Sequence, residues 1–141
     1  MKKVEVSSDE APQAIGPYSQ AVKAGNFIFC AGQVGKDPKT NKFVEGGIEA
    51  QTKQVLKNLE SVLNAAGAAL DDVVKTNVYL QNVEDFPKMN EVYAKFFEEP
   101  YPARATIEAG RLPQDALVEI DCIAQFQQKG DDCCGGGCGS C

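Results

Sequence analysis

The alternation of hydrophobic and polar positions predicts strands along most of the chain. The segment "NFIFCAGQV" predicts a strand from Phe27 to Val34 that stops at Gly35, because it is rich in aromatic and β-branched residues. A short strand is predicted in "KKVEVS", and another in the segment that ends at the turn Gly25-Asn26. The polar stretch "KDPKTNKF" after Gly35 predicts a loop.

The second half of the chain predicts three more strands. In "DDVVKTNVYLQNV" two sets of residues alternate, as in a strand covered on one side: Val74, Thr76, Val78 and Leu80 against Val73, Lys75, Asn77 and Tyr79. The last two strands are predicted at about Ala103 to Ala109 and Leu117 to Gln125.

Helical periodicity marks two segments. From Glu45 to Ala66 the apolar positions follow three-four spacing, and Gly67 is a natural stop. They are Ile48, Val55, Leu59, Val62, Leu63 and Ala66, with Thr52 filling a gap. A second helix is predicted from about Glu84 to Phe97, with Pro87 in its first turn. Its apolar face consists of Phe86, Met89, Tyr93 and Phe97.

The predicted order is β-β-β-α-β-α-β-β, an α+β fold with two helices on one face of a mixed sheet. A chain of 141 residues is long enough for one ordinary core. Right-handed crossovers place both helices on one side of the sheet, so its other face needs a different cover.

Arg104 and Glu119 are charged residues in the last two predicted strands. If the last two strands form an antiparallel hairpin, matching their apolar sides sends Arg104, Thr106 and Glu108 to the same face as Glu119 and Asp121. One interpretation is a solvated strand face with a surface salt bridge of about 0 to 1 kcal/mol. The other is a pocket, which requires that a second subunit cover this face.

The amino-acid composition excludes several kinds of catalytic site and disfavours several kinds of partner. The chain has no histidine, which excludes Ser-His and Cys-His nucleophilic pairs and His-ligated zinc. The net charge of −6 disfavours nucleic acid as the main partner. No apolar run approaches the length of a membrane span, and "MKKVEVSSDEAP" has no apolar signal region, so we expect a cytoplasmic protein without membrane contact.

The six cysteines fall into two groups. Cys30 and Cys122 lie in predicted strands and are expected to pack in the core as reduced thiols. The other four, Cys133, Cys134, Cys138 and Cys141, belong to a Gly-rich segment. We therefore divide the chain into a domain at 1–126 and a tail at 127–141, expected to be disordered. A soft metal ion, redox chemistry or an engineered addition at the tail stays open, and no metal site is assigned.

Five motifs together resemble the reactive intermediate deaminase family, the RidA or YjgF group. They are "AIGPYSQAV", "NFIFCAGQV", "NVYLQNVEDFPKMNEVYAKFF", "YPARATIEAGRLP" and "VEIDCIA", and they run in order from about Ala11 to Phe126. The resemblance implies a chorismate-mutase-like fold, a homotrimer with sites in clefts between subunits, and no cofactor.

The resemblance also implies an activity: hydrolysis of enamines and imines, such as 2-aminoacrylate, to 2-keto acids and ammonia. By this resemblance Arg104 receives the substrate carboxylate and Glu119 positions and activates water. Tyr18 and Asn90 line the cleft, and backbone groups at Gly32 and Thr106 complete it. Many family members carry Cys at the position of Thr106, so thiol chemistry is not transferred to it.

Other interpretations remain open at this point. Tyr18 alone is typical of a strand edge, and Asn90 alone of a structural hydrogen-bonding residue. A chain with this fold could also be a non-catalytic ligand-binding or regulatory module, or a holdase-type chaperone. A nuclease is disfavoured by the acidic charge and by the missing histidine.

Overall fold

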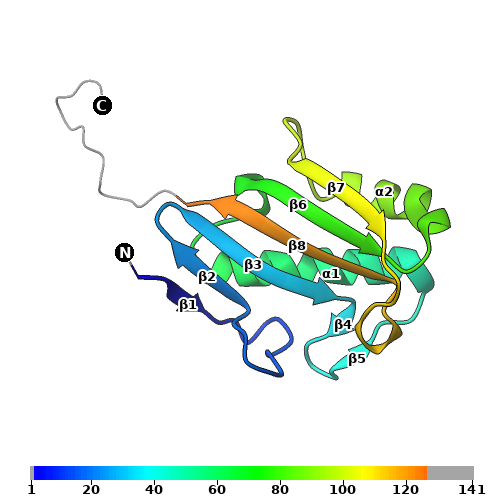
Figure 1. Cartoon of the computed structure of the whole chain (residues 1–141), viewed down its shortest axis with the longest axis horizontal. Coiled ribbons are helices and arrows are strands. Elements are labelled where there is room, and N and C mark those ends of the chain that lie inside the picture. The colour runs from blue at the N-terminus through cyan, green and yellow to red at the C-terminus, as the bar shows by residue number, and fades with distance from the viewer. Residues whose placement is uncertain (1, 127–141) are drawn as a thin grey trace.

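The computed structural model describes residues 2–126. Six strands form one mixed sheet in the order β1-β2-β3-β8-β6-β7 (Figure 1). Their bounds in that order are β1 (Val4–Val6), β2 (Ala21–Ala24), β3 (Phe27–Val34), β8 (Val118–Gln125), β6 (Val73–Leu80) and β7 (Ala103–Glu108). The predicted cysteine-rich tail, with its four thiols, lies outside the described residues.

Both helices, α1 (Gly47–Ala65) and α2 (Phe86–Ala94), lie behind the sheet as it is viewed in Figure 1. The core lies between them and the sheet. The periodic positions of α1 are buried as predicted, with Val55, Leu59 and Val62 at most 1% exposed. We call this side of the sheet the helix face and the other the open face. Within residues 2–126, no helix is long and apolar enough to cross a membrane.

The predicted element order and the α+β class are confirmed, with three local additions. The polar loop after Gly35 contains a two-stranded hairpin, β4 (Lys36–Asp37) and β5 (Lys42–Phe43). The second helix is shorter than predicted, because its first residues form a 3₁₀ turn (η2, Val83–Asp85) and α2 itself ends at Ala94. Two further 3₁₀ turns are η1 (Leu70–Asp72) and η3 (Pro113–Asp115). Pro87 lies in the first turn of α2, as expected.

One predicted alternation is wrong at the start of β6. The register of β6 against β8 shifts between Val73 and Lys75. Val73 is therefore buried, whereas Val74 is 41% exposed. A β-bulge inserts one residue and reverses the side on which the preceding side chain points, which alternation alone does not reveal.

The predicted hairpin of the last two strands is also wrong. β7 pairs in parallel with β6, and β8 lies between β3 and β6, antiparallel to both. The segment β6-α2-β7 is a strand-helix-strand unit, and such a unit places its two strands side by side and parallel. β7 becomes an edge strand, and β8 takes the central position that its buried apolar residues require.

The two predicted core cysteines are confirmed as buried. Cys30 and Cys122 are 7% and 2% exposed, and they are direct partners across β3 and β8. Their thiols face the helices among apolar side chains, and the hydrogen bond to the Cys30 thiol together with burial raises the pKa of Cys122. A thiol with a raised pKa is a poor nucleophile, so packing accounts for both residues.

Candidate functional site

The first candidate region is a cleft of about 420 Å³ at one end of β3 and β8, here called the Glu119 cleft. Its wall includes Tyr18, Gly32, Val34, Lys36, Gln114 and Glu119. Glu119 is half-buried and points to the open face, because its neighbours across the sheet are Val34 and Tyr79. Three of the predicted site residues, Tyr18, Gly32 and Glu119, therefore meet here.

A bulge in β3 shapes the floor of the Glu119 cleft. The pairing of β3 with β8 shifts between Cys30 and Gln33, so that β3 carries one extra residue there. The carboxyl group of Glu119 lies directly over Gly32, where an added Cβ would overlap the carboxylate oxygen Oε2. Gly32 is thus required for the close approach of Glu119 to the backbone.

The surroundings of Glu119 raise its pKa. Burial is the larger cause, and the negative charge of Asp121 is the second. Asp121 itself is held two residues along β8 by Asn77 Nδ2, which donates to it at 2.9 Å, and by the hydroxyl of Tyr79 at 3.1 Å. A carboxylate with a raised pKa is a better proton acceptor than an exposed glutamate.

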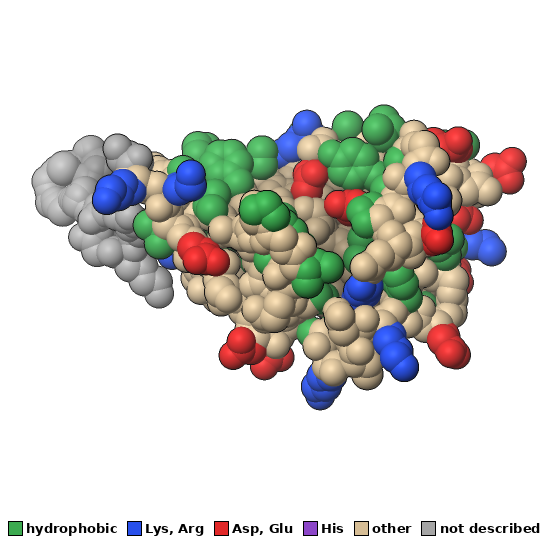
Figure 2. Space-filling model, turned by 60° about the horizontal axis from the view of Figure 1, so that its bottom comes forward, with side chains coloured by type: hydrophobic (Ala, Val, Ile, Leu, Met, Phe, Trp, Pro, Cys, Tyr) green, Lys and Arg blue, Asp and Glu red, His purple; other side chains and the backbone are tan. Residues whose placement is uncertain are grey.

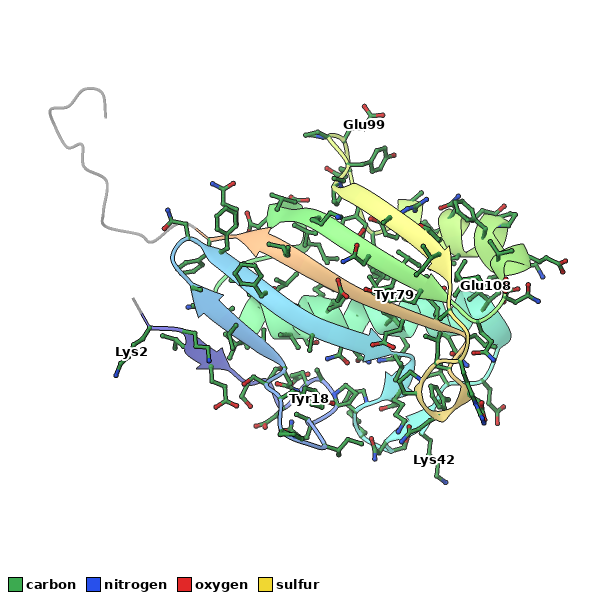
Figure 3. All side chains as sticks on the ribbon, viewed as in Figure 1. Lys2, Tyr18, Lys42, Tyr79, Glu99 and Glu108 are labelled. Atoms are coloured by element: carbon green, nitrogen blue, oxygen red, sulfur yellow. The ribbon has the colours of Figure 1, made fainter. Side chains whose placement is uncertain are left out.

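The loop before β2 closes the other side of the Glu119 cleft, and one buried amide secures it. The Ser8 backbone N–H donates to Gln20 Oε1 at 2.6 Å, and Gln20 Nε2 donates to the Pro12 carbonyl at 2.7 Å. Tyr18 lies on this loop, with 52% of its surface exposed (Figure 3). Its phenol is therefore available at the entrance to the cleft.

The second candidate region is a pocket of about 350 Å³ beside α2, here called the Arg104 pocket. Asn90, Tyr93, Ala94, Tyr101, Pro102 and Arg104 line it. Arg104 is on the helix face of β7, since its neighbour on β6 is the buried Thr76. Its guanidinium carbon lies 4.8 Å from the ring centre of Tyr93 and 5.4 Å from that of Phe86. Two predicted site residues, Asn90 and Arg104, meet here.

Arg104 has no acidic partner among residues 2–126. The ion pair found in that part of the chain joins Arg111 to Asp115 at 3.0 Å, on the surface. A half-buried arginine without a carboxylate keeps its charge and its N–H groups available. The Arg104 pocket can therefore accept an anion.

Thr106, the remaining predicted site residue, follows Arg104 by two positions on β7. Its hydroxyl oxygen is buried and has no hydrogen-bond partner within the described part of the chain. It lies on the same face of β7 as Arg104, next to Val78 of β6. The fold thus supplies a free hydroxyl close to the Arg104 pocket, a feature that the sequence pattern did not indicate.

The two regions are separate within one chain. The expectation that Arg104, Thr106 and Glu119 share a face is wrong, because Arg104 and Thr106 point to the helix face and Glu119 to the open face. The parallel register of β6 and β7 is the physical reason. The apolar Ala105 and Ile107, which alternate with Arg104 and Thr106, are exposed on the open face.

Sequence reasoning missed the aromatic neighbours of Arg104. Phe86 and Tyr93 were assigned only to the apolar face of a helix, and nothing in their spacing places an arginine above them. Asp121 was placed on the same face as Glu119 from the sequence, because residues two apart in a strand share a face, and the structure confirms this.

Comparison with known proteins places the chain in a family of this architecture. Residues 8–126 match the family described as Endoribonuclease L-PSP. A RutC family protein of Pyrococcus horikoshii is 56% identical over 124 residues, which cover 88% of this chain and 98% of that protein. A 2-iminobutanoate/2-iminopropanoate deaminase of Mus musculus is 46% identical over 119 residues, covering 84% and 88% of the two chains.

A solved structure agrees with both. The crystal structure of E. coli TdcF with bound serine superposes with a TM-score of 0.83 at 35% identity, and covers 87% of this chain and 98% of that one. The chain belongs to the Endoribonuclease L-PSP family, which includes the RidA or YjgF deaminases, and the resemblance seen in its five motifs is confirmed.

Proposed function

We propose that this protein hydrolyses small 2-imino acids, and the enamines that tautomerise to them, to 2-keto acids and ammonia. The observation that carries the proposal is an arginine without an acidic partner in residues 2–126, in a pocket that also contains Asn90. The deaminase name of the mouse relative supports the reaction type. The serine in the TdcF crystal supports small amino-acid-like ligands.

Arg104 binds the substrate carboxylate in this proposal. A guanidinium holds a carboxylate through two parallel N–H bonds, and the ammonium of lysine does not reproduce that geometry. Each charge-assisted bond contributes roughly 1.5 to 3 kcal/mol. The amide of Asn90 and the unpartnered hydroxyl of Thr106 are further hydrogen-bonding groups nearby.

Glu119 activates the water. The water oxygen adds to the imine carbon while Glu119 accepts one proton. Glu119 passes that proton to the nitrogen, which gives a carbinolamine. The proton of the new hydroxyl then moves through Glu119 to the nitrogen as the carbon-nitrogen bond breaks, so that water and imine become ketone and ammonia. The raised pKa of Glu119 supports this role, because it favours both accepting and returning a proton. Tyr18, at the entrance to the cleft, is a hydrogen-bonding group for the substrate or for the leaving nitrogen.

The reaction needs Arg104 and Glu119 at one site, although the two residues lie on opposite faces of the sheet in one chain. We therefore propose a homotrimer in which the Arg104 pocket of one subunit meets the Glu119 cleft of the next. The open face offers surface for such contacts: Phe27, Phe29 and Ile107 are 42%, 43% and 53% exposed on it. Figure 2 shows apolar side chains gathered along the upper part of the molecule, with acidic groups among them.

The net charge of −6 disfavours RNA as a substrate, despite the endoribonuclease name of the family. A binding module without chemistry is the main competing function.

The deciding measurement is ammonia release from 2-aminoacrylate generated in situ, followed beside light scattering of the same sample. We expect accelerated ammonia release from a trimer. Release at the uncatalysed rate would reject the deaminase, and a catalytically active monomer would reject the shared site.

A further inference from the structure

The guanidinium of Arg104 lies against the rings of two aromatic residues of α2. Its central carbon is 5.4 Å from the ring centre of Phe86 and 4.8 Å from that of Tyr93. Both distances are within the roughly 6 Å at which a cation is attracted by the electron-rich face of a ring. Phe86 and Tyr93 are seven residues apart, two helical turns, so the helix presents both rings on one side.

Tyr93 is the more firmly held of the two rings. Its hydroxyl shares a hydrogen bond of 2.8 Å with Thr76 Oγ1, and Thr76 is the direct neighbour of Arg104 across β6 and β7. Its ring also packs against Phe97, with ring centres 4.6 Å apart. Tyr93 is only 5% exposed. The ring beneath Arg104 is therefore fixed to the same strand pair that carries Arg104.

Among residues 2–126, the aromatic contacts bring no carboxylate to the N–H groups of Arg104. A carboxylate partner would occupy the N–H groups of the guanidinium and neutralise its charge. A ring attracts the cation without accepting its in-plane N–H groups. Burial raises the pKa of the Tyr93 phenol, although Thr76 and Arg104 act in the opposite direction. The phenol therefore stays neutral and does not compete with an incoming anion.

We propose that Tyr93, assisted by Phe86, is a positioning residue that holds the guanidinium of Arg104 and leaves its N–H groups directed to a substrate carboxylate. This inference rests on the proposed function and assigns a residue beyond the six site positions carried over from the family. It explains how an arginine without an ion-pair partner in the described chain keeps one orientation. Tyr93 acts through Arg104 and takes no part in the bond-making steps.

The proposal predicts an effect on binding more than on turnover. The carboxylate is bound in both the ground state and the transition state, so a loosened Arg104 raises KM and leaves kcat nearly unchanged. One cation-ring contact corresponds to roughly 2- to 30-fold in affinity, depending on its exposure to water.

The test uses four variants of the full chain: Tyr93→Leu, Tyr93→Phe, Phe86→Leu and, as the matched control, Phe97→Leu. Phe97 is as buried as Tyr93 and packs on it, but no cation of residues 2–126 lies over its ring. The probe is 2-ketobutyrate, with its Kd measured by calorimetry beside the KM and kcat of the deaminase. Circular dichroism reports whether each variant folds.

We expect Tyr93→Leu to weaken 2-ketobutyrate binding by roughly 5- to 30-fold, with KM rising and kcat changing little. Tyr93→Phe keeps the ring and is expected to bind within about twofold of the original chain, although it loses the bond to Thr76. Phe97→Leu is expected to bind the ligand normally. If Tyr93→Leu does not fold, the partly buried Phe86→Leu takes its place, with a loss of about 2- to 10-fold.

Three results would overturn the inference: normal affinity in the folded ring-less variant, an equal loss in Phe97→Leu, or a loss in Tyr93→Phe as large as that in Tyr93→Leu. Arg104→Ala separates this failure from failure of the proposed function. If Arg104→Ala abolishes binding while Tyr93→Leu does not, only the positioning role is wrong. If Arg104→Ala binds and turns over normally, the proposed function is wrong as well.

Discussion

The Arg104 pocket and the Glu119 cleft differ in the surroundings that the fold gives to their charged side chains. The cation lies on the helix face, against two rings and, within residues 2–126, without an acidic partner. The anion lies on the open face over a glycine, beside a second carboxylate, and its pKa is raised. Among residues 2–126, neither Arg104 nor Glu119 belongs to an ion pair. A substrate with a carboxylate and an electrophilic carbon would complement both regions.

The largest effect is expected from breaking the Arg104 pocket. Arg104→Ala removes two charge-assisted bonds, so kcat/KM should fall by about 10² to 10⁴ and 2-ketobutyrate should no longer bind. Arg104→Lys should recover little of either, because it lacks the planar fork. Calorimetry and ammonia release check both variants, and a fully active Arg104→Ala would favour the binding-module interpretation.

Removing the Glu119 carboxylate should lower kcat and leave ligand affinity nearly unchanged. Glu119→Gln cannot accept the proton of water, so kcat should fall by about 10² to 10⁴ while 2-ketobutyrate still binds. Glu108→Gln, at an exposed position of β7, is the control. Normal turnover of Glu119→Gln would assign water activation to another group or to the substrate itself.

A mixing experiment tests whether the two regions combine between subunits. Neither Arg104→Ala nor Glu119→Gln should be active alone, but trimers reassembled from both should recover about a quarter of the active sites, as random cyclic assembly predicts. The recovered site combines Arg104 of one subunit with Glu119 of the next. No recovery in verified mixed trimers would show that each site uses one chain only.

A smaller effect is expected from crowding the Glu119 cleft without removing its charge. Gly32→Ala places a Cβ where the Glu119 carboxylate lies, so the carboxylate must move and kcat should fall by roughly 10- to 100-fold. Gly110→Ala is the matched control, since within residues 2–126 no heavy atom beyond its two chain neighbours lies within 4 Å of the added Cβ. Equal rates for the two alanine variants would show that the position of Glu119 over Gly32 is unimportant for turnover.

The smallest effect concerns pH. Because the pKa of Glu119 is raised, activity should fall on acidification at a pH above the usual value of 4.5. Asp121→Asn removes the second cause of this shift, and the acid limb of the kcat/KM profile should move to lower pH while burial keeps part of the shift.

The raised pKa of Glu119 also affects the stability of the folded protein. A group whose pKa is raised by folding destabilises the folded state once the pH exceeds its unfolded pKa. Glu119→Gln should therefore raise Tm near pH 7, with the gain disappearing below the ordinary pKa of glutamate. Thermal unfolding at several pH values checks this, and a gain that persists in acid would assign it to another cause.

The sequence predicted the helices and strands themselves better than it predicted which strands lie side by side. β3 was predicted with its observed bounds, and α1 within about two residues, because period and stop signals are local. The site residues were proposed from the family motifs, and their roles stay predictions. Their grouping into one cleft with Glu119 and another with Arg104 was not predicted, since it depends on strand order.

The amino-acid sequence by itself determined the element order, the buried face of α1 and the absence of histidine chemistry. Only the tertiary structure decided that β8 lies between β3 and β6, and that Arg104 and Glu119 point to opposite faces. Side-chain alternation within a strand says which residues share a face, but not which face meets the helices. At β7 that choice follows from parallel pairing with β6 through α2, a contact between segments far apart in the chain.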